Sequence, residues 1–218
     1  MRRMIMPNWC TNEVTVFANE KTLEKFAEFV KAKDTYHGRC SERYEHVRDT
    51  ETDKWELKNK ESFCEQDDPY KDTCDKRQEA FCFQSILPMP SALDGVGSPP
   101  KVVDTQEEVD DWVANNEDYI KMGMGRPITK KEHAMLLTEY ETDSWYDWCC
   151  NHWGTKWDVH DVHIEDSDYY VRYDFDTAWN PPQGIYEALI EKFNGEEDFS
   201  IQWFYREDGM QMAGYLPD

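Results

Sequence analysis

Residues 9–17 read WCTNEVTVF, and this stretch decides the type of fold that we expect for the chain. Residues 12–17 alternate between one set, Asn12, Val14 and Val16, and another, Glu13, Thr15 and Phe17. This period of two is typical of a β-strand with one buried face. Asn19 can then cap a helix over residues 20–33. One face of that helix is apolar, because apolar residues recur at helical spacing: Leu23, Phe26, Ala27 and Val30.

The last third of the chain repeats this mixture of strands and helices. Alternation predicts strands over residues 156–164 and 169–176, which the polar turn Glu165–Asp168 joins. A helix over residues 183–193 follows. We expect it to bury its apolar residues, which are Ile185, Leu189, Ile190 and Phe193.

Two further strands are predicted over residues 199–205 and 210–216. The sequence Glu207-Asp208-Gly209 between them is a good turn, so the two strands predict a hairpin. Residues 80–87 also have the composition of a strand. Pro88 would end that strand, because proline donates no hydrogen bond to a sheet.

The middle of the chain differs from both ends. Residues 34–79 are highly charged without a clean period, and we interpret them as an insertion outside the main core. The sequences TQEE at 105–108 and TKKE at 129–132 each fit a capping box that begins a helix. A third helix is expected over residues 143–151.

The predicted order of elements is that of an α+β protein. Strands that pair as hairpins, with helices between them, suit an antiparallel sheet with helices on one face. The closest simple template is the ferredoxin-like, split βαβ fold. We expect a single domain over residues 1–218, with a charged insertion at about 34–79 and a helical insertion at about 103–151.

The chain carries a strong and uneven negative charge. Its 218 residues have a formal net charge of -22, and residues 101–218 hold 27 of the 46 acidic side chains but 9 of the 24 basic ones. A field of this sign repels phosphate backbones and anionic membranes, and it attracts basic surfaces of other proteins. The charge therefore disfavours direct binding to nucleic acid or a membrane. Solubility alone, or adaptation to high salt, would also explain it.

Cysteine usage and the start of the chain favour a reducing compartment. The seven cysteines are odd in number and irregularly spaced, and no apolar stretch of a secretory signal follows Met6. No apolar run reaches the length of a membrane span. We therefore expect free thiols and a cytoplasmic location.

The segment 145–158, WYDWCCNHWGTKWD, is the densest group of unusual residues and holds four tryptophans. One interpretation is an aromatic pocket for a small molecule or nucleotide. The alternative is a joint between helix and strand whose indoles pack in the core. The pocket would use Trp145, Tyr146, Trp153, Lys156, Trp157 and Trp179.

The sequence carries no recognisable catalytic, metal or cofactor motif. Cys149 and Cys150 are adjacent, which seldom suits one tetrahedral zinc ion, and His160 and His163 would face opposite sides of a strand. Nothing in the spacing brings either cysteine to His152 as a nucleophile pair. Glycine-rich motifs for phosphates and dinucleotides are absent. We therefore favour a protein that is not an enzyme, with no catalytic residue, cofactor or metal assigned.

Two runs of acidic residues, between Lys101 and Lys121 and between Lys156 and Arg172, contain no lysine or arginine. Carboxylates along helices and hairpins can imitate the charge array of duplex DNA and occupy a basic groove. The alternative is an ordinary solvated face. The predicted partner-binding residues are Asp104, Glu107, Glu108, Asp110, Asp111, Glu117, Asp118, Asp158, Asp161, Glu165, Asp166 and Asp168.

Four stretches of the chain together resemble one family. They are MPNWCTN at 6–12, ILPMP at 86–90, WCCNHWGTKWD at 148–158 and FDTAWNPP at 175–182. With these motifs in this order, nearly the whole chain resembles the YubB/Api-type ferredoxin-like family of phages and conjugative plasmids. The resemblance implies a ferredoxin-like fold, a mobile-element origin and an existence inside the bacterial host cytoplasm. It carries no catalytic residues.

Charge and resemblance together predict a non-enzymatic phage or plasmid accessory protein. It would bind a host protein that has a basic, nucleic-acid-binding surface, and would inhibit a defence or nuclease complex by occlusion or DNA mimicry. One alternative is a ligand-binding protein, or an enzyme, that uses the tryptophan-rich segment. Another is an RNA platform on the sheet, against which the charge argues. The sequence indicates neither the partner's identity nor the oligomeric state.

Overall fold

The computed structural model describes residues 8–31, 44–48, 55–59, 80–121 and 125–217. The chain divides into two compact units. The first comprises Met1–Gly38, Asp72–Pro88 and Cys149–Asp218, and the second comprises Arg39–Lys71 and Met89–Trp148. Most of each insertion predicted from the sequence therefore belongs to the second unit.

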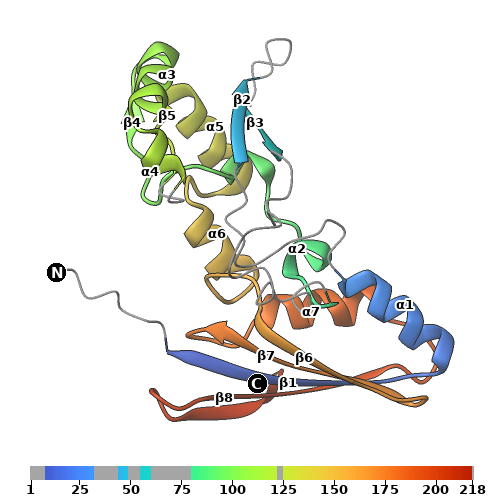
Figure 1. Cartoon of the computed structure of the whole chain (residues 1–218). Helices are drawn as coiled ribbons and strands as arrows, with labels where there is room; N and C mark the ends of the chain where they lie inside the picture. Colours follow the sequence, from blue (N-terminus) through green and yellow to red (C-terminus); the bar gives the residue numbers. More distant parts are fainter. Residues whose placement is uncertain (1–7, 32–43, 49–54, 60–79, 122–124, 218) are drawn as a thin grey trace, which may run out of the picture. The chain divides into compact units, whose positions relative to one another are not determined.

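A five-stranded antiparallel sheet forms one layer of the first unit (Figure 1). Its strand order is β6-β7-β1-β8-β9. The strands are β1 (Trp9–Phe17), β6 (His160–Asp166), β7 (Tyr170–Ala178), β8 (Ser200–Glu207) and β9 (Met212–Leu216). All five strands were expected from the sequence, although β6 begins later than predicted. The mixture of this sheet with several helices confirms the α+β class.

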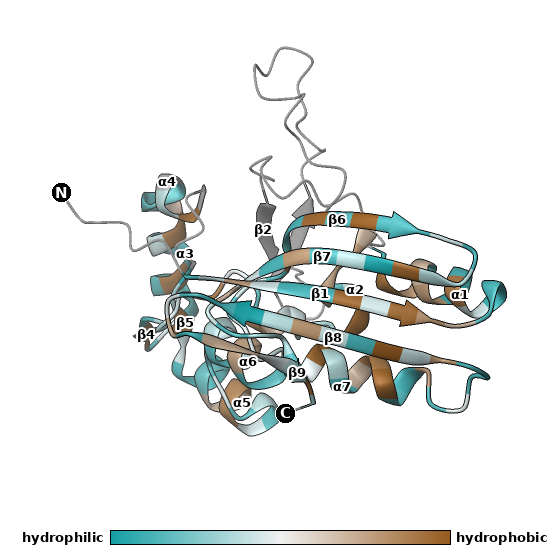
Figure 2. Cartoon of the chain, turned by 90° about the horizontal axis from the view of Figure 1, so that it is seen from below, coloured by the Kyte–Doolittle hydropathy of each residue, from teal (hydrophilic) through white to brown (hydrophobic). Residues whose placement is uncertain are grey.

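The register of the sheet separates a buried face from an open one. Val14 on β1 pairs with Tyr173 on β7 and Trp203 on β8, and all three are buried. The next residue, Glu13, pairs with Asp174 on β7 and points to the opposite face, because successive strand residues alternate. Figure 2 views the sheet from this open side, with α1 and α7 behind it.

Three helices cover the other face of the sheet: α1 (Glu20–Val30), α2 (Phe83–Ile86) and α7 (Gln183–Lys192) (Figure 1). Asn19 caps α1 as predicted, since its side chain accepts a hydrogen bond from the Thr22 N–H at 3.0 Å. Phe26 of α1 is fully buried, and its ring centroid lies 5.2 Å from that of Phe193. These contacts place the aromatic core between helices and sheet.

One predicted core residue of α7 lies outside the core. Ile185 and Leu189 are fully buried, whereas Ile190 is 38% exposed. Residues 185 and 189 are one helical turn apart and share a face, while position 190 lies about 100° further around the helix. The expectation that Ile190 is buried was therefore wrong.

The strand predicted over residues 80–87 is also wrong, because residues 83–86 form helix α2. The carboxylate of Asp158 caps it. Its oxygens accept hydrogen bonds from the backbone N–H groups of Phe83 at 2.8 Å and Gln84 at 3.3 Å. A helix start leaves such N–H groups without intrahelical partners, and here the acceptor comes from a distant part of the sequence.

The second unit contains the remaining helices and short strands. They are β2 (Tyr44–Arg48), β3 (Trp55–Asn59), a 3₁₀ turn (Ser91–Leu93), β4 (Val102–Val103), α3 (Gln106–Asn115), α4 (Glu117–Lys121), β5 (Ile128–Thr129) and α5 (Lys130–Tyr140). Helix α6 (Trp145–His152) spans the division between the units. Apart from β2 and β3, the predicted charged insertion at 34–79 lies outside the described residues.

The two helices predicted from TQEE and TKKE are confirmed as α3 and α5. Thr105 and Glu108 form a complete capping box at α3. At α5, the Thr129 hydroxyl accepts from the Glu132 N–H at 3.1 Å, but the Glu132 carboxylate pairs with Arg126 at 2.6 Å. Local sequence thus identified both helix starts.

Candidate functional site

The residues of the predicted aromatic pocket are divided between the two units. Trp145 and Tyr146 belong to the second unit, whereas Trp153, Lys156, Trp157 and Trp179 belong to the first. Trp153 is buried, packs edge-on against Phe83 and donates to the Leu87 carbonyl at 2.7 Å. This tryptophan therefore serves the core. Trp157 is 40% exposed, and the Lys156 ammonium lies 4.0 Å from its ring centroid.

The sequence motifs behind the family resemblance are joined by buried polar contacts. The Asn12 amide donates to the Thr177 hydroxyl at 2.9 Å and accepts from the Trp203 indole N–H at 3.1 Å. The Thr155 hydroxyl donates to the Ala178 carbonyl at 2.8 Å. The buried contacts of Asn12 fix strand β1 against β7 and β8, and the Thr155 contact fixes the loop before β6 against β7. In these contacts the motif residues hold the fold.

Two glycines allow the end of α6 to approach the start of α7. A Cβ atom on Gly184 would lie 1.7 Å from the His152 carbonyl oxygen. Gly154 has a φ of +89°, which favours glycine, and a Cβ there would lie 2.9 Å from the Gln183 nitrogen. Backbone packing thus explains both Gly184 and Gly154, the glycine of the motif at 148–158.

Two of the described cysteines, Cys82 and Cys149, are poor nucleophiles. Burial raises the pKa of Cys149 to about 12, and burial together with the nearby Asp158 carboxylate raises the pKa of Cys82 to about 12. Both thiols are therefore protonated at neutral pH, and the thiolate is the reactive form. Cys40, Cys64 and Cys74 lie outside the described residues.

The described part of the chain holds no group of three or more His, Cys, Asp or Glu residues placed to bind a metal ion. The prediction that His160 and His163 face opposite sides of a strand is wrong, because β6 has a bulge between them. They pair with Asp176 and Asp174, which are two residues apart on β7, so both histidines lie on one face.

The first acidic run lies around α3. Within it, Glu108 accepts hydrogen bonds from the N–H groups of Thr105 and Asp104, which lower the pKa of Glu108, and Asp104 pairs with Lys130 at 2.5 Å. Asp110 is half-buried, Glu117 is exposed, and the side chain of Asp118 is not among those described. Glu107 and Asp111 are exposed, lie one helical turn apart and have no ion-pair partner in the described part of the chain.

The second acidic run lies in and before the β6–β7 hairpin. Its Asp158 differs from the rest, because its carboxylate is turned inward onto α2 and does not belong to an anionic surface. Asp161 lies 3.7 Å from the His163 ring nitrogen. Asp166 and Asp168, at the turn, are exposed.

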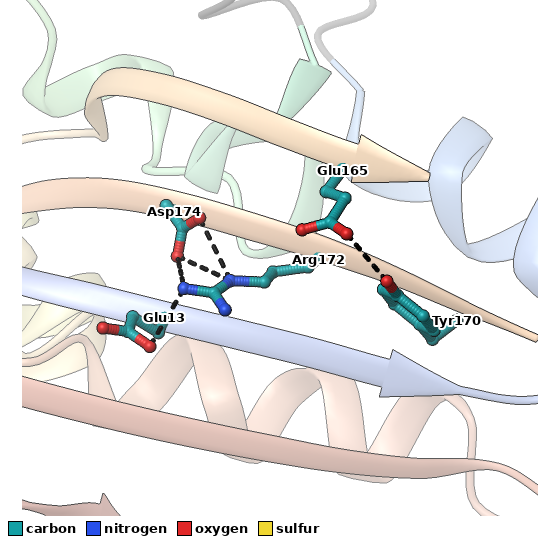
Figure 3. A network of polar contacts seen from close by, with 5 residues as sticks. All are labelled: Glu13, Glu165, Tyr170, Arg172 and Asp174. Atoms are coloured by element: carbon teal, nitrogen blue, oxygen red, sulfur yellow. Dashed lines mark hydrogen bonds and ion pairs between the residues drawn. The ribbon is translucent and has the colours of Figure 1, made fainter. Parts of the chain in front are cut away.

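The open face of the sheet carries a further group of carboxylates (Figure 3). Arg172 donates to Asp174 at 2.9 Å and to Glu13 at 3.0 Å, and the Tyr170 hydroxyl donates to Glu165 at 2.8 Å. One guanidinium therefore serves two carboxylates, with a third beside it, so this network has an excess of negative charge.

A cavity of about 570 Å³ lies between α1 and the β6–β7 turn, within the first unit. Four acids line it: Glu20 and Glu24 of α1, Asp166 at the end of β6 and Asp168 of the turn. The sequence identified the last two. It did not identify the two glutamates, because on a single amphipathic helix they look like an ordinary solvated face.

No helix among the described residues is long and apolar enough to cross a membrane. The chain matches no protein-family model, no curated protein and no solved structure.

Proposed function

We propose that the protein is a non-enzymatic binding protein that attaches through carboxylates to a basic surface of a partner protein. One observation carries this proposal: exposed acids such as Glu107 and Asp111 have no cationic partner among the described residues, and two cations of the second unit are engaged by other acids. Lys130 pairs with Asp104, and Arg126 pairs with Glu132. The negative charge of these acids is therefore available to another molecule.

The finer part of the proposal is a ferredoxin-like fold of the YubB/Api type. Its support is the strand order, in which β7 lies between β1 and β6, and β1 lies between β7 and β8. In the sequence, α1 lies between β1 and β6, and α7 lies between β7 and β8. In the sheet, β7 separates β1 from β6, and β1 separates β7 from β8. This is the pattern of a split βαβ unit, with β9 added at the edge.

Membership of that family would imply a phage or plasmid accessory protein in the bacterial cytoplasm. Its partner would be a host protein that binds nucleic acid, such as a nuclease or defence complex, and it would act by occlusion or DNA mimicry. The support is electrostatic, because a groove that binds phosphates also attracts an array of carboxylates.

The test is capture of partners from host lysate by the immobilised protein, at low and high salt, with identification by mass spectrometry. We expect a nucleic-acid-binding protein whose recovery falls with salt and which duplex DNA displaces. The double variant Glu107→Gln/Asp111→Asn should recover about fivefold less, because two unscreened charge contacts are lost.

The matched control is Glu139→Gln/Glu191→Gln, which removes the same charge at two other exposed positions. Equal losses in both variants would indicate a general effect of net charge and contradict a defined binding surface on α3. Recovery that is independent of salt and of DNA would contradict the proposal as a whole.

A further inference from the structure

The cavity between α1 and the β6–β7 turn has the size of a binding site. Its volume of about 570 Å³ lies within the range of roughly 300–1,000 Å³ that is typical of ligand pockets. It lies on the helix-covered side of the sheet, at the edge strand β6. Helix α1 and the hairpin of β6 and β7 frame it.

The floor of the cavity is apolar. Leu23, Val171 and Tyr173 line it and are buried, while Ile164 of β6 lines it and is 48% exposed. Burial, together with the charge of Asp166, raises the pKa of Tyr173 above its usual range. Ile164 thus presents an apolar side chain that no other described element covers.

The rim of the cavity is anionic. Glu20, Glu24, Asp166 and Asp168 make no hydrogen bond or ion pair through their side chains with other described residues. Lys31 is the one cation among the described lining residues, and it lies 4.0 Å from Glu28. The lining therefore carries four carboxylates and one ammonium, so the electrostatic potential above the apolar floor is negative.

We propose that this cavity takes arginine or lysine side chains from a basic segment of the partner protein. Such side chains have a long apolar stem and a charged head, which match the apolar floor and the anionic rim. This inference rests on the proposed function, and it places part of the contact in the first unit rather than on α3. Glu20 and Glu24 would then bind the partner together with Asp166 and Asp168.

The test uses an acetylated and amidated peptide of alternating leucine and arginine, titrated into the full chain at low salt by calorimetry. Asp166→Asn/Asp168→Asn should weaken binding about fivefold, because two charge contacts are removed. Ala27→Phe, which fills the cavity from α1 without changing the charge, should weaken it similarly. Glu139→Gln/Glu191→Gln is the matched control and should change the affinity less than about twofold, and the α3 variant Glu107→Gln/Asp111→Asn is measured beside it. Unchanged melting temperatures establish that each variant folds.

Each other outcome overturns the inference. Loss of binding in the α3 variant but in neither cavity variant would keep the proposed function and reject this cavity. Spermidine that displaces the peptide at similar concentration would assign the cavity to small cations. A wild-type chain that binds no peptide at low salt would reject the cavity as well, while the capture experiment above tests the proposed function separately.

Discussion

The carboxylate of Asp158 organises three backbone groups. It accepts from the N–H groups of Phe83 and Gln84 at the start of α2, and from its own neighbour Val159 at 2.8 Å. Burial raises the pKa of Asp158 above its ordinary value, although the hydrogen bonds oppose this rise. A single side chain thereby joins the loop before β6 to the core helix α2.

We expect Asp158→Ala to lower the free energy of unfolding by about 1–2 kcal/mol, because two N–H groups of α2 lose their acceptor. Chemical denaturation measures this change. Asp168→Ala is the control, because Asp168 is exposed and makes no hydrogen bond through its side chain with described residues, and it should stay within about 0.5 kcal/mol of wild type. Equal stabilities of the two variants would contradict the capping role.

The raised pKa of Asp158 also predicts a dependence on pH. The folded state binds this proton more tightly than the unfolded state, so the stabilisation is complete below the ordinary pKa and is lost as pH rises through the folded-state value. Relative to Asp158→Asn, wild type should therefore lose melting temperature as pH rises above about 4, the ordinary pKa of an aspartate. If the difference in melting temperature between wild type and Asp158→Asn is constant, or if wild type gains relative to the variant as pH rises, the pKa of Asp158 is not raised.

At the scale of elements, the close approach of α6 and α7 depends on Gly184. In most helices a change from glycine to alanine is stabilising by up to about 1 kcal/mol. Here we expect Gly184→Ala to be destabilising by about 2 kcal/mol or more, because the new methyl group meets the His152 carbonyl. Thermal unfolding measures the change.

Gly195 gives the matched comparison. Its φ of +93° strains an alanine, but no atom lies within 4 Å of the added Cβ. Gly195→Ala should therefore be destabilising by only about 1 kcal/mol, through backbone strain alone. If Gly184→Ala is the milder of the two changes, the packing of α6 against α7 is not as tight as described.

Elements with local signals could be predicted from the sequence, and those with distant signals could not. Thr105 and Thr129 lie beside the helices that they cap, and the alternation of β1 lies within nine residues. Helix α2 depends on Asp158, which is 75 residues from Phe83. The same distinction holds for the candidate site, because Glu20 and Asp166 become neighbours of one cavity only through the tertiary fold.

At the scale of the whole molecule, the net charge of -22 predicts a response to salt. Like charges repel in the compact state, and added salt should screen this repulsion more than it weakens surface ion pairs. The melting temperature should therefore rise when sodium chloride increases from about 0.02 M to about 0.3 M. Potassium chloride at the same ionic strength is the control. A melting temperature that falls would mean that ion pairs outweigh the repulsion.

Strand β1 lies in the middle of the sheet but comes before both of its partner strands in the sequence, so it is synthesised before them. Its residues pair with β7, as Trp9 does with Ala178, and with β8, as Cys10 does with Glu207. A ribosome makes about 5–20 residues per second, so β1 exists for several seconds or longer before either partner does. During that time both of its edges are unpaired, and unpaired edges invite association between nascent chains. Chains interrupted before β7 would therefore be the ones that require a chaperone.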